Sequence, residues 1–137
     1  MLGESPAEVP ETRFMMLEFF LAGGYSMVLV LLFAALTLVA AIAFMRRPKE
    51  KDVGRIRALS AATVFTVLGG FSANLAAVFT KVPGNLEWAH SPDLALIVMT
   101  GLGEALTPAI LGFTLLSITW LITAAGVGRL GAAEAAA

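Results

Sequence analysis

The stretch Thr100-Gly-Leu-Gly-Glu-Ala-Leu-Thr-Pro108 lies within an apolar run that extends from residue 94 to about residue 127. This run is longer than the ~20 residues with which an α-helix crosses ~30 Å of hydrocarbon. A charged side chain at bilayer depth costs from roughly 2.5 kcal/mol upward and usually faces protein or water rather than lipid. We therefore predict that Glu104 lies on a membrane helix and has a functional role there.

Two further apolar runs, at residues 25–45 and 58–80, also have the length of a membrane span. Of the 137 residues, 58% are hydrophobic and only 14% are charged, and the mean hydropathy is +0.87. Soluble domains carry about 25% charged residues. The predicted fold class is an all-α membrane protein with three transmembrane helices, at about residues 25–45, 58–80 and 94–127.

The connection after the first span is strongly basic. Against Glu50 and Asp52 it carries Arg46, Arg47, Lys49, Lys51, Arg55 and Arg57. Short loops rich in Lys and Arg remain in the cytoplasm. We therefore expect the N-terminus and residues 81–93 outside, and the C-terminus in the cytoplasm. Nucleic-acid or lipid binding is the alternative explanation of the basic loop, but topology alone accounts for it.

The membrane domain is expected at residues 14–128, between a disordered outer tail at residues 1–13 and a cytoplasmic tail at residues 129–137. Residues 14–21 are predicted to form a short helix at the outer interface. Pro48 should end the first helix, and Ser91-Pro92-Asp93 is typical of a helix start. No cysteine is present, which excludes disulfides and thiolate chemistry.

Polar side chains recur at helical spacing in the second and third spans. The two faces that they define could meet and line a path, which would contain Glu104, Thr107, Thr114, Thr100, Thr66 and Asn74. The alternative for each hydroxyl is a bond to the carbonyl one turn earlier in its own helix. For Glu104 the alternative is a protonated carboxyl group that bonds to a neighbouring helix.

Pro108 gives this region a second feature. Proline has no amide hydrogen, so the carbonyl of Glu104 loses its partner and a kink is favoured there. Three helices do not surround a carboxylate well, so we expect the chain to associate with itself. A ring of subunits would place several Glu104 side chains around a common axis.

Other chemistry is sparse in the sequence. It contains no phosphate-binding loop and no nucleophile paired with a base, and His90 is its single histidine. A lone histidine in a polar loop seldom forms a metal site. The sequence therefore predicts no enzyme, no cofactor and no metal.

Three stretches of the chain resemble motifs of one known family and occur in the order that the family has. They are Glu18-Phe-Phe-Leu-Ala-Gly-Gly-Tyr-Ser-Met27, Leu68-Gly-Gly-Phe-Ser72 and Gly101-Leu-Gly-Glu-Ala-Leu106 with Gly112. They resemble the entry to the first span, the second-helix motif and the Gly-x-x-Glu-Ala-Leu signature of the third helix in the MotA/TolQ/ExbB proton-channel family, ExbB/TolQ branch. The third stretch is the most specific, and Glu104 matches the glutamate of that signature.

The resemblance implies a pentameric stator in the bacterial inner membrane, built around single-span partners of the ExbD/TolR type. Such a complex converts proton flow into mechanical work on an outer partner. At the positions of two family threonines this chain has Ala73 and Ala109. The large cytoplasmic segment of the family is reduced here to residues 46–57, so the chain resembles a minimal member over about residues 14–128.

The predicted function is an ExbB/TolQ-like inner-membrane subunit of a proton-driven channel or stator that serves mechanical work or transport. Its expected partners are copies of itself, an ExbD/TolR-like single-span subunit and the lipid bilayer, with no nucleic acid. The alternative is a non-conducting membrane scaffold or accessory subunit that packs against partner helices. A small secondary transporter fits less well, because three spans contain no visible inverted repeat.

Overall fold

The computed structural model describes residues 24–137, and all regular structure in this range is helical. Its elements are α2 (Gly24–Arg46), α3 (Glu50–Gly84), α4 (Leu86–Ala89), α5 (Leu94–Ala105) and α6 (Thr107–Ala135). Three segments, Gly24–Arg46, Glu50–Gly84 and Leu94–Ala135, are long and apolar enough to cross a membrane. The prediction of an all-α chain with three such segments is confirmed. The predicted outer tail and interfacial helix lie outside the described residues.

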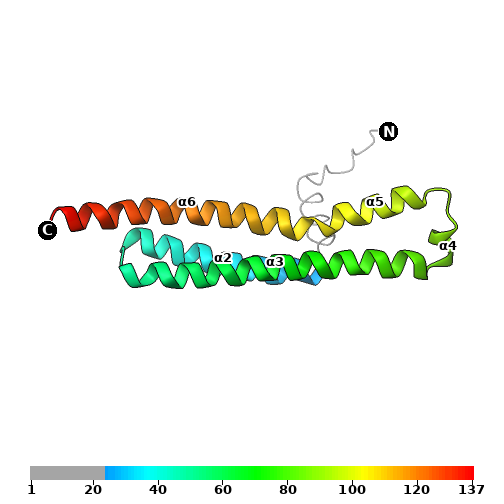
Figure 1. Cartoon of the computed structure of the whole chain (residues 1–137), viewed down its shortest axis with the longest axis horizontal. Coiled ribbons are helices and arrows are strands. Elements are labelled where there is room, and N and C mark those ends of the chain that lie inside the picture. The colour runs from blue at the N-terminus through cyan, green and yellow to red at the C-terminus, as the bar shows by residue number, and fades with distance from the viewer. Residues whose placement is uncertain (1–23) are drawn as a thin grey trace, which may run out of the picture.

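The three long segments lie side by side over only part of their length (Figure 1). The longest element, α3, follows the length of the molecule, and α5 and α6 lie end to end beside it. Most contacts of α2 are with α3 and α6, whereas α5 packs mainly against α3. One part of the molecule is therefore a three-helix bundle, and the part that contains α5 is a two-helix hairpin.

Glycines allow α6 to approach its two neighbours closely. A Cβ atom added at Gly126 would lie 2.6 Å from a ring carbon of Phe44 and 3.3 Å from the Cα atom of Met45. A Cβ at Gly112 would meet Val67 and Val30. Small residues at such positions let membrane helices pack backbone against backbone. The contacts also define the register of the bundle, in which α2 and α6 run parallel.

The centre of the bundle contains hydroxyl groups as well as apolar side chains. The hydroxyl oxygens of Thr37 in α2 and Thr63 in α3 are 3.0 Å apart and form a hydrogen bond between the helices. Thr119 and Thr123 of α6 are also buried, and each donates to the carbonyl four residues earlier, at 2.8 Å. The hydroxyl groups of Thr119 and Thr123 are therefore satisfied within their own helix, which is the alternative to pore lining given above for threonines in membrane helices.

The connection between α2 and α3 is shorter than the basic loop suggested. As expected from Pro48, α2 ends just before it, but α3 begins at Glu50, eight residues before the predicted span. Glu50 and Asp52 lie in the first turn of α3, where carboxylates are stabilised by the helix dipole. Most of the basic segment is thus helical.

The ends of the third segment also differ in extent from the prediction. Ser91 Oγ accepts the amide of Asp93 at 3.1 Å, as a capping residue does, but regular helix starts at Leu94. At the other end α6 continues to Ala135 rather than ending near Gly128, because alanine favours helix strongly. Most of the predicted cytoplasmic tail is therefore helix.

Candidate functional site

The third segment is interrupted beside Glu104. α5 ends at Ala105, Leu106 separates the two helices, and Pro108 lies in the first turn of α6. The Leu106 amide donates to the Gly103 carbonyl at 3.2 Å. The Thr107 hydroxyl donates to the Glu104 carbonyl at 2.8 Å. The backbone acceptor that Pro108 leaves without its amide partner is thus satisfied by a side chain.

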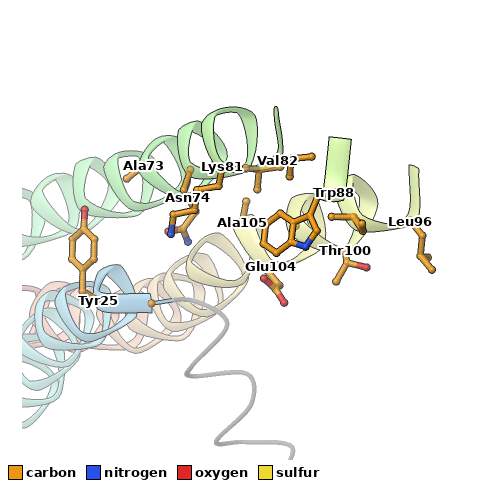
Figure 2. Close-up of a pocket in the computed structure, with 15 residues that line it drawn as sticks. Tyr25, Ala73, Asn74, Lys81, Val82, Trp88, Leu96, Thr100, Glu104 and Ala105 are labelled. Carbon is orange, nitrogen blue, oxygen red and sulfur yellow. The ribbon is translucent and has the colours of Figure 1, made fainter. Parts of the chain in front are cut away.

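A cavity of about 720 Å³ lies between α3 and α5, and Gly24 and Tyr25 of α2 contribute to its lining. We call it the outer groove, after its place at the end of the molecule that contains α5 (Figure 2). Its α3 wall consists of Ala73, Asn74, Ala77, Val78, Lys81 and Val82, and its α5 wall of Leu96, Ile97, Thr100, Gly101, Glu104 and Ala105. Both sets repeat with helical spacing, so each wall is one face of a helix. Trp88 of α4 also borders the groove.

The walls are brought together by another glycine. A Cβ atom at Gly101 would lie 2.9 Å from a methyl group of Val78, whereas one at Gly103 would meet nothing within 4 Å. Gly101 therefore faces α3 and Gly103 faces outward. This phase places Thr100 and Glu104 at the border of the groove, where both side chains are exposed.

The carboxylate of Glu104 has no hydrogen-bond or ion-pair partner among the described residues. In Figure 2, Asn74 extends from α3 toward the opposite helix, whereas the carboxylate of Glu104 points away from α3. Lys81 lies on the α3 wall of the same groove but forms no ion pair with Glu104. A single copy of residues 24–137 therefore leaves this carboxylate at its surface.

The register of the bundle indicates the level of Glu104 along the helices. Gly112 of α6 faces Val30 of α2, and Gly126 faces Phe44, so the same offset separates both pairs. The lining of the outer groove agrees with this register, because Glu104 borders the same cavity as Gly24 and Tyr25, the first two residues of α2. Glu104 is thus near the N-terminal end of α2 rather than level with its middle.

The structure brings three of the six predicted lining residues, Glu104, Thr100 and Asn74, to the outer groove. Thr107 is buried at the helix break, and Thr114 is exposed on α6. Thr66 is half-buried and donates to the Ala62 carbonyl at 2.8 Å. These three do not line the groove, and no continuous stripe joins the six residues.

Sequence reasoning missed two sets of polar residues. Lys81 belongs to the groove, although it was assigned to the outer connection; its seven-residue spacing from Asn74 is the signal that places both on one helix face. The buried hydroxyls of Thr37, Thr119 and Thr123 were also missed. The spacing of Gly112, Leu116, Thr119, Thr123 and Gly126 marks the interior face of α6, and all five are buried.

Residues 24–137 contain no group of three His, Cys, Asp or Glu side chains that could hold a metal ion. The Nδ1 atom of His90, which follows α4 directly, lies 2.9 Å from the carbonyl oxygen of Leu86 at the start of that helix. The polar groups at the outer groove are the carboxyl group of Glu104, the amide of Asn74, the hydroxyl of Thr100 and the ammonium group of Lys81. Such groups can exchange protons or form hydrogen bonds.

No protein-family model, curated protein or solved structure matches the chain.

Proposed function

We propose that the protein is an ExbB/TolQ-like subunit of the bacterial inner membrane. In this proposal its copies form a ring, and the ring is the channel or stator part of a complex that couples the proton motive force to mechanical work or transport. The exposed carboxylate of Glu104 carries the proposal, because it lies on a membrane-length helical segment and has no partner among the described residues.

Association follows from the surroundings of this carboxylate. Large apolar side chains such as Met99 and Ile110 are exposed on the same helical segment, and they suit either lipid or another protein. A charged group among them is stable when a second molecule covers it or when water reaches it. A neighbouring copy that packs on the α5 surface would supply the cover, and a single-span ExbD/TolR-like helix would occupy the centre of the ring.

The proton role rests on the isolation of Glu104. It is the only ionisable side chain between Asp93 and Arg129. Intramembrane carboxylates commonly serve proton relays. Thr100 lies one turn before Glu104 at the border of the same groove and can hold a water molecule beside the carboxyl group. In the proposed topology the level of Glu104, near the N-terminal end of α2, lies toward the outer side of the membrane.

A non-conducting scaffold is the second candidate, and a specific observation favours it. The hydroxyls of Thr66 and Thr107 are used by backbone carbonyls of their own helical segments, so they are not free to pass protons along. Ala73 and Ala109 have no hydroxyl where the resembled family has threonine. In a scaffold Glu104 would bond to a fixed donor on the neighbouring helix.

The proposed topology places the N-terminus and α4 outside, and the loop between α2 and α3 in the cytoplasm. Because the chain has no cysteine, single-cysteine variants can be labelled at one position. In spheroplasts, whose inner membrane is intact and directly accessible, a membrane-impermeant maleimide is expected to label Trp88→Cys and not Lys51→Cys. Labelling of Lys51→Cys and not of Trp88→Cys would show the opposite orientation in the membrane and contradict the proposed topology.

The proposed ring is tested by cross-linking in membranes. Thr100→Cys, at the border of the outer groove, is expected to form covalent dimers under mild oxidation, because in the proposed ring the Glu104 side of α5 faces the common axis, where equivalent residues of the copies come close together. Val39→Cys is the matched control, since Val39 of α2 is 64% exposed but distant from the groove along the bundle. Equal cross-linking of both variants would indicate random collision and contradict the ring.

A further inference from the structure

A second hollow, of about 220 Å³, lies at the other end of the bundle, where α2 turns into α3. Its polar border consists of Arg47, Lys49, Asp52 and Arg55. We call it the basic hollow. Of the cationic residues in this part of the chain, Arg46, Lys51 and Arg57 do not line it. The fold thus selects three of six neighbouring cations to surround one space.

The basic hollow carries an excess of positive charge. Three cations face one carboxylate, that of Asp52, which leaves a net charge of +2. None of the three cations forms an ion pair with a carboxylate of the described residues. Arginine presents a fork of donors that matches two phosphate oxygens, and lysine adds a point charge. The hollow is therefore suited to an anion with several oxygens, such as a phosphate group.

The opposite border of the hollow is apolar. It consists of Ala40, Ala43, Phe44 and Ile56, and Phe44 and Ile56 are each 1% exposed and belong to one packed cluster. These two side chains form the closely packed apolar base of the hollow. A freely soluble phosphate ion gains nothing from such a surface, whereas an amphiphile can place its apolar part there.

An exposed apolar stripe on α2 leads to this border. Leu32, Leu36 and Val39 are exposed and lie on one face of α2 with Ala43, which is itself exposed and lines the hollow. An acyl chain that lies along this stripe would bring its headgroup to Arg47 and Arg55. The cationic border of the hollow and the apolar stripe of α2 are therefore adjacent, as the headgroup and the acyl chain of a phospholipid are.

We propose that the basic hollow binds the phosphate-bearing headgroup of an anionic phospholipid, with an acyl chain along the Leu36–Val39 side of α2. Basic pockets between membrane helices on the cytoplasmic side bind such headgroups in general. The site would hold one lipid at the α2–α3 turn and fix the depth of this turn in the membrane. This inference requires the membrane placement of the chain but does not depend on the proton role of Glu104.

The test measures lipid affinity of the purified full chain in a neutral detergent by native mass spectrometry. The titrants are phosphatidylglycerol, phosphatidylcholine with the same chains, and inorganic phosphate. The variant Arg47→Gln/Lys49→Gln/Arg55→Gln removes the three lining cations. Its control, Arg46→Gln/Lys51→Gln/Arg57→Gln, removes the same charge from the same segment outside the hollow.

We expect tighter binding of phosphatidylglycerol than of phosphatidylcholine by the unmodified chain. The lining variant should lose affinity for phosphatidylglycerol by about tenfold or more and the control by about twofold, since cations next to the headgroup contribute most. Circular dichroism checks that both variants remain helical. Should the lining variant fail to fold, Arg55→Gln alone is expected to weaken binding about threefold, against no change for Arg57→Gln.

Three results would overturn the proposal. Equal losses in the lining variant and its control would mean that only the overall charge of the loop attracts the lipid. Equal affinity for both lipids would remove the role of headgroup charge. Binding of inorganic phosphate as tight as that of phosphatidylglycerol would assign the hollow to a soluble anion instead.

Discussion

Gly126→Ala is expected to destabilise the helix bundle by about 2 kcal/mol, within the range of 1–3 kcal/mol that overpacking of a close contact costs. The added methyl group would lie 2.6 Å from the ring of Phe44 and 3.3 Å from the Cα atom of Met45. Phe44 packs against Ile56 and Ala41, and the Cα atom of Met45 belongs to the backbone of α2, which cannot rotate aside as a side chain can. The helices would have to separate at this point.

The opposing effect is the helix propensity of alanine, which favours Gly→Ala by about 1 kcal/mol in a helix interior. Gly128→Ala isolates this effect, because a Cβ atom at Gly128 would meet nothing within 4 Å. Unfolding of both variants in mixed micelles, followed by circular dichroism, compares them. We expect Gly128→Ala to equal or exceed the unmodified chain in stability. A Gly126→Ala variant as stable as Gly128→Ala would contradict the packing described.

Separation of the helices at Gly126 should also affect a contact nearby. Arg129 of α6 donates to the carbonyl of Met45 at 2.6 Å, which satisfies one of the carbonyls left open at the end of α2. Gly126 and Arg129 are three residues apart and therefore lie on neighbouring parts of one face. The loss of this hydrogen bond would add to the cost of Gly126→Ala.

The membrane-length helices could be predicted from the sequence, whereas their full extents could not. Apolar runs report where side chains can face lipid, so they locate the spans, and Pro48 correctly marks the end of α2. Hydropathy does not report where a helix continues into water. Glu50 begins α3 within the basic segment, and Ala135 ends α6 well after the last apolar run.

The candidate site could be predicted only in part, because helical spacing was extended across an interruption. Thr100 and Glu104 share a face of α5, but Thr107 and Thr114 belong to α6, which starts again after Leu106. Spacing across that break no longer defines one face. The level of Glu104 was also hidden, since it depends on which side chains meet Gly112 and Gly126, and a single sequence does not show such pairs.

The second large effect is expected for Glu104→Gln. Glutamine has nearly the same shape as glutamate and can still form hydrogen bonds, but it does not take up or release a proton. A ring of Glu104→Gln subunits should therefore assemble normally and lose proton-driven activity. Glu134→Gln is the matched control, because Glu134 is exposed near the end of α6 and far from the groove.

Assembly and conduction separate the two proposed functions. In a scaffold, an uncharged amide at residue 104 would still bond to the neighbouring helix, so oligomer size would be retained and no flux would be seen with either residue. In a proton-driven subunit, oligomer size would be retained while flux depends on the carboxyl group. The size of the Glu104→Gln oligomer, measured by native mass spectrometry, confirms that a loss of flux is not a loss of assembly.

The most direct measurement is proton flux into liposomes that contain the protein together with the ExbD/TolR-like single-span subunit proposed as its partner, under an imposed membrane potential and with a pH-sensitive dye inside. We predict flux for the unmodified chain and for Glu134→Gln, and flux no greater than that of protein-free liposomes for Glu104→Gln. Flux that is unchanged by Glu104→Gln would contradict the assignment of Glu104 as the proton-responsive group.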